Sequence, residues 1–361
     1  MQRAMQRSWQ RSMTGRTPRT LSLASPAASP AGSAPSRRLL LSAGLGLAAA
    51  AALRPARAAG SIRIGYQKYG SLVLLKGRGL LEATLQPLGT TVSWSEFPSG
   101  PPLLEALNAG AIDFGSAGEA PPIFAQAASP ELRYVAAEPP APRGEAILVP
   151  KDSPIRSVAD LRGRTIALNK GSNVHYLLVR ALEQAGVPYD AVKLAFLAPA
   201  DANAAFVRGS VDAWVIWDPF QAAAERATGA RVLVDGRGVD GHALAPNRQF
   251  YLSRRGFTDT SPGIVSAVLK AIAEVDAWAQ GHAESVAAEL APSVGIPAPV
   301  LGVALGRLSY GVAPLDAAAV ADQQKVADAF HGLGLLPKPI RVADAVWTPP
   351  GRTAGTRAEN P

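Results

Sequence analysis

Three loops in this sequence place small and hydrogen-bonding residues directly before a helical pattern. In the first loop Ser99 precedes an apolar-faced segment, and in the second loop Gly118 and Glu119 precede another. The third loop runs from Asn169 to Asn173 and leads into the clearest helical pattern of the chain. The first turn of a helix has unpaired backbone N–H groups and the positive end of the helix dipole, so such loops favour anions. The loops therefore predict a binding site for a small anion.

The third of these loops is the strongest candidate, because Gly171 lets its backbone approach a ligand closely. Ser172, Asn173 and His175 offer hydrogen bonds from the first helical turn. An alternative is that Ser172 only caps the helix, and the pattern does not decide between the two. Glu119 is either a favourable partner of a helix dipole or a member of the site, where it would repel an anion unless it met a donor.

Further candidates lie at the ends of expected strands. Gln67 and Lys68 end the first strand and are either solvent-facing turn residues or donors in a cleft. Trp214 and Trp217 lie on a strand that reads as buried, where they are either core residues or aromatic walls around an apolar ligand tail. Asp218 follows directly and precedes proline, a pattern typical of a helix N-cap with proline at the first helical position.

Patterns for metal, cofactor and nucleophile chemistry are missing from the sequence. The four histidines are scattered, without the HxxxH or HExxH spacing that places two ligands on one helical face. There is no GxxxxGKS or GxxxxGKT phosphate loop and no GxSxG nucleophile elbow. The GxGxxG match at Gly236–Gly241 is followed by no helical pattern, so we interpret it as a loop. We expect no metal, no cofactor and no catalytic residue.

Net charge separates the first 58 residues from the remainder. The whole chain has 36 Lys and Arg against 28 Asp and Glu. Residues 1–58 hold nine Arg and no acidic residue, which leaves 27 basic and 28 acidic side chains beyond them. The formal charge of +8 therefore does not indicate a nucleic-acid partner.

Residues 1–58 have the composition of an export signal. Arg37 and Arg38 precede the uncharged run Leu39–Leu53, whose 15 residues are fewer than the roughly 20 that span a bilayer. Ala56-Arg57-Ala58 follows as a small-x-small cleavage site. The arrangement resembles a twin-arginine signal and predicts a periplasmic chain that begins near Ala59. A retained membrane anchor, an organellar transit peptide and an ordinary secretory signal are the alternatives.

The remaining residues read as an α/β fold. About 300 residues follow the leader, more than the roughly 250 to 300 at which one hydrophobic core stops growing, so two lobes are expected. Short apolar runs alternate with segments of helical spacing, which predicts largely parallel sheets. The expected strands lie at 62–66, 92–94, 134–136, 146–149, 165–168, 192–197, 211–217 and 232–234.

The clearest of the expected helices has a continuous apolar stripe along one face. In Asn173–Ala185 the apolar residues recur at i, i+3, i+4, i+7, i+8 and i+11, and Gly186 supplies a stop. Ile264–Ala279 and Ala317–Phe330 read as longer helices. The amphipathic stripes predict that these helices pack on a sheet or on one another.

Short runs along the chain resemble the aliphatic sulfonate-binding proteins of ABC importers. These runs are Ile64–Lys68, Glu96–Pro101, Leu103–Asn108, Gly118–Ala127, Lys170–Ser172, Pro199–Ala202 and Val211–Pro219. The resemblance extends over about residues 61–348, and runs in this order are highly specific.

The resemblance implies a type II periplasmic-binding-protein fold, with two lobes that are joined by a hinge and close on a ligand. Each lobe is expected to be a mixed sheet flanked by helices. We place the first lobe at 59–148 and 247–348, the second lobe at 149–246, and a disordered tail at 349–361. The resemblance also implies an ABC permease and its ATPase as partners of a monomeric chain.

The implied ligand is an organic sulfonate held by neutral donors. Ser99, Gly118 and Ser172 would contribute these donors, and Trp214 and Trp217 would lie against the alkyl part. Taurine, nitrate or another small anion is an alternative ligand, and an enzyme on the same fold, such as a thiamine-pyrimidine synthase, is an alternative function. Sulfinate desulfinases share the fold but use a cysteine, which this chain lacks. We therefore expect a binding protein that performs no reaction.

Overall fold

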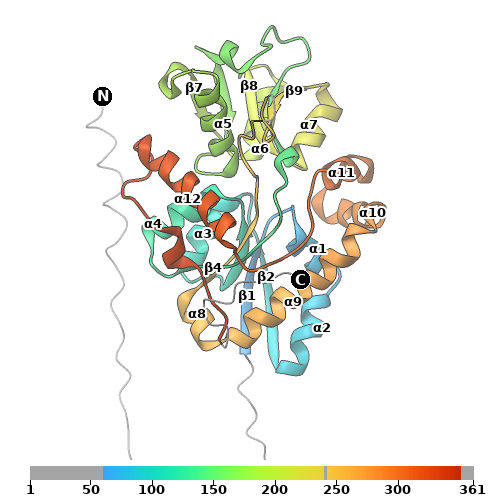
Figure 1. Ribbon diagram of the computed structural model, residues 1–361. Coiled ribbons are helices and arrows are strands. Elements are labelled where there is room, and N and C mark those ends of the chain that lie inside the picture. Colours follow the sequence, from blue (N-terminus) through green and yellow to red (C-terminus); the bar gives the residue numbers. More distant parts are fainter. Residues whose placement is uncertain (1–59, 240–241, 351–361) are drawn as a thin grey trace, which may run out of the picture. The chain divides into compact units, whose positions relative to one another are not determined.

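The computed structural model describes residues 60–239 and 242–350. The predicted leader at 1–58 and nearly all of the predicted tail lie outside these residues. The described part of the chain contains two five-stranded sheets, each accompanied by helices (Figure 1). Within it, no helix combines the length and the apolar character needed to cross a bilayer.

The first sheet has the strand order β2-β1-β3-β10-β4. Its strands are β1 (Gly60–Tyr66), β2 (Thr90–Glu96), β3 (Phe114–Ala117), β4 (Leu132–Ala137) and β10 (Phe250–Arg254). β1 is parallel to β2 and β3, and β10 is antiparallel to β3 and β4. The sequence did not predict β3, because Phe-Gly-Ser-Ala contains no β-branched residue and reads as a loop.

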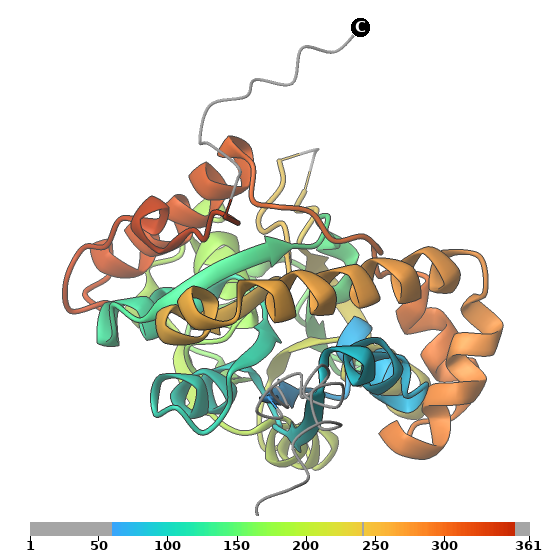
Figure 2. The same cartoon turned by 90° about the horizontal axis from the view of Figure 1, so that it is seen from below.

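The helices of this lobe are mostly short, with α9 and α12 as the two longest. They are α1 (Ser71–Gly77), α2 (Leu80–Leu85), α3 (Gly100–Asn108), α4 (Ala120–Ala128), α8 (Arg255–Thr260), α9 (Pro262–Gln280), α10 (Ala283–Val294), α11 (Ala298–Leu305) and α12 (Ala317–Gly332). α9 lies across one face of the first sheet (Figure 2). Its buried Val265, Val268 and Ile272 share a hydrophobic cluster with Phe114 and Tyr251 of the sheet. This burial explains the apolar stripe of the predicted helix.

The second sheet has the strand order β7-β6-β8-β5-β9. Its strands are β5 (Glu145–Val149), β6 (Thr165–Leu168), β7 (Lys193–Phe196), β8 (Ala213–Trp217) and β9 (Arg231–Asp235), and its helices are α5 (Asn173–Gln184), α6 (Pro199–Val207) and α7 (Phe220–Thr228). β6 is parallel to β7 and β8, whereas β5 is antiparallel to β8 and β9. Both sheets are therefore mixed, as the resemblance implied.

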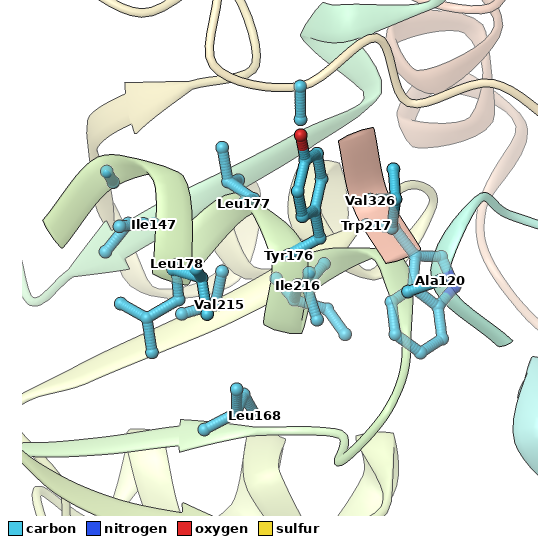
Figure 3. Close-up of a cluster of buried hydrophobic side chains, with 14 of the residues drawn as sticks. Ala120, Ile147, Leu168, Tyr176, Leu177, Leu178, Val215, Ile216, Trp217 and Val326 are labelled. Carbon is cyan, nitrogen blue, oxygen red and sulfur yellow. The ribbon is translucent and has the colours of Figure 1, made fainter. Parts of the chain in front are cut away.

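Helix α5 confirms the predicted amphipathic helix to within one residue at its end. Leu177 and Leu178 of α5 pack with Leu168 of β6 and Val215 of β8 in one buried cluster (Figure 3). Gly186 follows the helix with a φ of 63°, a left-handed conformation that glycine adopts without strain.

The predicted boundary between the lobes needs a correction. Residues 145–148 were assigned to the first lobe, but they form most of β5, and Ile147 lies in register with Val215 of β8. The chain therefore leaves the first sheet before Glu145. It returns to the first sheet between β9 and β10.

C-terminal elements of the first lobe also contact the second lobe. The ring of Phe330 of α12 lies between the two lobes. Its centroid is 5.0 Å from that of Phe124 of α4 in the first lobe and 5.2 Å from that of His175 of α5 in the second lobe. Arg307, which follows α11, forms an ion pair of 2.6 Å with Glu225 of α7. Contacts of both apolar and ionic character thus connect the two lobes.

Candidate functional site

A small polar pocket lies where elements of the two lobes meet. It is lined by Gln67, Tyr69, Gly100, Ser116, Gly118, Asn173, Trp217 and Gln249. Asn173 and Trp217 come from the second lobe and the other residues from the first. The free volume of about 10 Å³ is close to the minimum that holds one water molecule. A larger occupant therefore requires the two sides of the pocket to separate.

Three helices point their N-termini toward this pocket. Gly100 and Asn173 are the first residues of α3 and α5, and Gly118 stands two residues before α4. The unpaired N–H groups and the dipoles of these three helices create a positive potential without any charged side chain. The arrangement suits an anion.

Both pocket glycines leave no room for a side chain. A Cβ atom on Gly118 would lie 2.8 Å from Cγ of Asn173, and one on Gly100 would lie 2.7 Å from Cγ of Pro121. These distances are shorter than ordinary carbon contacts. The close approach of Gly118 to Asn173 brings the two lobes together at the pocket.

The polar side chains of the pocket are neutral. Gln67 donates from Nε2 to the carbonyl oxygen of Ser116 at 3.1 Å. The buried hydroxyl of Tyr69 has no hydrogen-bond partner among the described residues. Burial raises the pKa of Tyr69 well above its ordinary value, so the hydroxyl stays protonated and can donate to a ligand.

A larger apolar pocket of about 480 Å³ adjoins the polar one and shares Gln67, Tyr69 and Trp217 with it. Its apolar lining includes Phe97, Pro98, Pro199, Trp214, Phe220 and Ile296. Lys68 and Glu96 also line it and form an ion pair of 3.8 Å. The two pockets together have room for an anionic head and an apolar tail.

The structure brings several predicted site residues together. Gln67, Gly118, Asn173 and Trp217 line the polar pocket, and Gln67, Lys68, Trp214 and Trp217 line the apolar one. Trp217 and Ala120, the first residue of α4, belong to one buried hydrophobic cluster (Figure 3). Trp214 and Trp217 are 1% and 7% exposed, so both are buried residues as well as pocket walls. The two alternatives that the sequence left open are therefore compatible.

Ser172 and His175 line neither of these pockets. The Ser172 hydroxyl donates to the carbonyl oxygen of Asn169 at 2.7 Å and forms no cap hydrogen bond with α5. His175 accepts from the Gly171 N–H at Nδ1 and lies 2.6 Å through Nε2 from the Tyr189 hydroxyl. Burial and the nearby Lys170 charge lower the pKa of His175 to about 4, so the ring is neutral at physiological pH.

Ser99 and Glu119 are buried beside the polar pocket. Ser99 occupies the N-cap position of α3, next to Gly100, and its side chain forms no cap hydrogen bond. Glu119 follows Gly118, and its carboxylate accepts from the backbone N–H of Arg248 at 2.7 Å. Both residues therefore stand behind the surface of the pocket.

The helix that follows Asp218 begins one residue later than predicted. The helix α7 begins at Phe220, so proline is not its first residue. The Asp218 carboxylate still accepts from the N–H of Ala222 in the first turn at 3.0 Å, and it pairs with Arg307 at 3.4 Å. Burial raises the pKa of Asp218 to about 6, although the Arg307 charge opposes this shift.

Several pocket residues were not predicted. Tyr69 directly follows Gln67 and Lys68, and Gly100 lies inside a candidate loop, so both had a local signal. Gln249 comes from the segment that returns to the first sheet, and Phe220 comes from the start of α7. Neither of these two has a local sequence signal, because only the fold brings it to the pocket.

This fold and this pair of pockets define a two-lobed solute-binding protein of the periplasmic type. Residues 98–285 match the family described as NMT1/THI5 like, and the chain belongs to that family. Over 292 residues it is 44% identical to a protein of Escherichia coli (strain K12) described as an aliphatic sulfonates-binding protein, covering 80% of this chain and 89% of that one.

Two solved structures are similar to the chain over most of its length. The alkanesulfonate-binding protein SsuA from Xanthomonas axonopodis pv. citri, bound to MOPS, is 42% identical with a TM-score of 0.74, covering 80% of this chain and 98% of that one. The periplasmic aliphatic sulphonate binding protein SsuA from Escherichia coli is 43% identical with a TM-score of 0.72, covering 83% and 97%.

Proposed function

We propose that this protein is the extracytoplasmic solute-binding component of an ABC importer and that it captures aliphatic sulfonates between its lobes. The convergence of three helix N-termini on a polar pocket that opens into an apolar one carries the proposal. A sulfonate has a permanently charged head and an apolar tail, and each pocket matches one of these parts. The bound molecule named for the Xanthomonas relative, MOPS, is itself a sulfonate.

In this proposal the head group is held by neutral donors. The backbone at Gly100 and Gly118 and the Tyr69 hydroxyl face the head, and Trp217 separates the head from the tail. Neutral donors suit a weakly basic oxyanion that must later be released to a permease, because a fixed cation would slow that release. The site binds its ligand and performs no reaction.

Delivery requires a change in the polar pocket, since its present volume does not admit a sulfonate. Gly118 and Asn173 belong to different lobes, so movement of the lobes about their connections would open the pocket, and ligand bound to both would favour closure. The proposed partners are a permease and its ATPase. Export by a twin-arginine-type signal that is cleaved near Ala58 completes the proposal and places the protein in the periplasm.

Thermal unfolding with a series of anions tests this function. A ligand at 100 times its Kd adds about 2.7 kcal/mol to the free energy of unfolding, which raises the Tm measurably. We expect stabilisation by ethanesulfonate and longer alkanesulfonates. Sulfate and nitrate should stabilise less because they have no apolar tail, and taurine should stabilise less because its charged ammonium group is costly to bury in the apolar pocket. Unchanged melting with every sulfonate, or measurable turnover of any of them, would contradict the proposal.

A further inference from the structure

Two buried glutamates lie behind the polar pocket, one from each lobe. Glu119 connects β3 to α4, and Glu145 is the first residue of β5. Their exposed fractions are 1% and 0%. Neither residue is used as a ligand donor in the function proposed above, and sequence reasoning did not single out Glu145 at all.

Each of these carboxyl groups has only one oxygen in a hydrogen bond. Oε2 of Glu119 accepts from the Arg248 N–H at 2.7 Å, and Oε2 of Glu145 accepts from Nδ2 of Asn173 at 2.6 Å. Both Oε1 atoms are buried without a partner among the described residues. An ionised carboxylate with one buried, unpartnered oxygen loses hydrogen bonds to water that no protein group replaces. A protonated carboxyl group costs far less free energy to bury.

The surrounding charges do not neutralise the pair. The groups that face Glu119 are Arg248 and Tyr176, and those that face Glu145 are Glu119, Asp235 and Tyr69. In the described part of the chain, no basic side chain donates a hydrogen bond to either carboxyl group.

Burial makes both carboxyl groups weak acids, and the charge of Glu119 strengthens this effect at Glu145. Burial raises the pKa of Glu119 to about 8, although backbone N–H groups and the Arg248 charge oppose this shift. Burial and the charge of Glu119 raise the pKa of Glu145 well above its ordinary value. At neutral pH the pair therefore keeps at least one proton.

The pair is connected to the polar pocket through two adjacent residues. Glu119 follows Gly118, which lines the pocket. Glu145 holds the amide of Asn173, and the same amide donates to Oδ1 of Asn247 at 2.9 Å. A negative charge on this pair would act on a bound anion through a buried region of low dielectric constant, where repulsion is strong.

We propose that Glu119 and Glu145 form a proton-holding pair which couples capture of the anion to uptake of a proton. The proposal rests on the anion-binding function above. It assigns the pair the role of keeping the pocket free of negative charge when the lobes enclose a sulfonate. Two carboxyl groups whose charge is removed in this way would not repel the bound anion.

The sign of the pH dependence follows from linkage. A bound anion makes loss of the pair's proton harder, so binding raises the pKa of the pair, and the ionised pair takes up a proton when the anion binds. Affinity is therefore greatest where the pair is protonated and falls as the pH rises through about 8. The folded chain also holds these protons to higher pH than the unfolded chain, so the pair's contribution to stability falls as the pH rises from the ordinary glutamate pKa of 4.5 to about 8.

Titration calorimetry on the unmodified chain tests the proposal directly. Ethanesulfonate is the probe, because it carries no group that titrates in this range. We expect a Kd about tenfold higher near pH 9.5 than near pH 6.5. At about pH 8, the binding enthalpy in buffers of different ionisation enthalpy should reveal net proton uptake, with a fraction of a proton or more per sulfonate.

Two variants sharpen the test. The double variant Glu119→Gln and Glu145→Gln mimics the protonated pair, and we expect it to bind equally well at both pH values without proton uptake. Glu138→Gln is the matched control, since Glu138 is also a buried acid whose pKa is raised to about 8 by burial, and its hydrogen bond is to Tyr251 instead. The control should retain both the pH dependence and the proton uptake.

The outcomes separate this inference from the proposed function. Binding of ethanesulfonate with a pH-independent Kd and no proton uptake would overturn the inference and leave the function standing. Loss of the proton uptake in Glu138→Gln but not in the double variant would show that Glu138, and not the pair, takes up the proton. Absence of ethanesulfonate binding at every pH would instead contradict the function. If the double variant does not fold, the calorimetry of the unmodified chain still decides.

Discussion

The polar and apolar pockets share three residues but are built on different principles. The polar pocket combines backbone and small residues near the starts of α3, α4 and α5 with larger side chains such as Gln67 and Tyr69, and its free volume is about 10 Å³. The apolar pocket is formed by large side chains such as Phe97, Trp214 and Phe220, and its volume is about 480 Å³. The first is tight and the second is spacious.

This difference divides recognition into a strict and a tolerant part. Hydrogen bonds from backbone groups are directional and tolerate little displacement, so the polar pocket selects one kind of head group. Contacts with apolar side chains have no preferred direction, and their strength scales with the apolar area buried. The comparison predicts that substitutions in the polar pocket abolish binding, whereas substitutions in the apolar pocket change the preference among tails.

Gly118→Ala should break the polar pocket and have the largest effect. The new Cβ would lie 2.8 Å from Cγ of Asn173 when the lobes are closed, so the variant disfavours the closed form. We expect the Kd for every alkanesulfonate to rise at least about a hundredfold, measured by titration calorimetry.

Gly263→Ala in α9 is the control for this substitution. No atom lies within 4 Å of a Cβ built at Gly263, and the residue has no positive φ. Its affinity should match that of the unmodified chain. A Gly118→Ala variant that bound as tightly as this control would mean that the head group lies elsewhere.

Phe220→Ala should alter the apolar pocket and have an intermediate effect that depends on the tail. Phe220 lines this pocket and packs against Trp217 with a ring-centroid distance of 6.3 Å. We expect the Kd of hexanesulfonate to rise about tenfold and that of methanesulfonate to rise less than about twofold, because only the longer tail loses apolar contact area.

Phe257→Ala supplies the matched control, since Phe257 is half-buried on α8 and lies outside the apolar pocket. It should leave the ratio of the two affinities unchanged. An equal loss for both sulfonates in Phe220→Ala would show that the aromatic ring supports the head-group site instead of the tail.

The starts of α3 and α5 could be predicted from the sequence because local residues encode them. Ser99 and Ser172 stand at the N-cap positions of these helices, and the apolar stripe of α5 was visible in the spacing of Leu177 and Leu178. β6 was predicted to the residue for the same reason, since its apolar run is bounded by polar loops. The helix starts that line the polar pocket are thus local in origin, but only the fold brings them together with Gln67, Trp217 and Gln249.

The apolar pocket could not be predicted in this way, because its walls come from distant segments. Phe97, Phe220 and Ile296 are separated by many residues, and only the packing of α7 against α11 and the order of the strands bring them together. Glu145 shows the same limit. The sequence places it before a strand of apolar residues, but its burial arises because β5 pairs with β8 and β9 of the second sheet.

Ser172→Ala should have the smallest effect on binding. It distinguishes residues that contact the ligand from residues that only stabilise the loops around the pocket. The Ser172 hydroxyl donates to the Asn169 carbonyl at 2.7 Å, inside the loop that precedes α5. Loss of this bond should lower the free energy of unfolding by about 0.5–1.5 kcal/mol, measured by urea titration. The Kd for ethanesulfonate should change less than about threefold, because the backbone that positions Asn173 is otherwise retained. A tenfold weaker Kd with an unchanged free energy of unfolding would instead make Ser172 a direct ligand of the sulfonate, as the family resemblance implied.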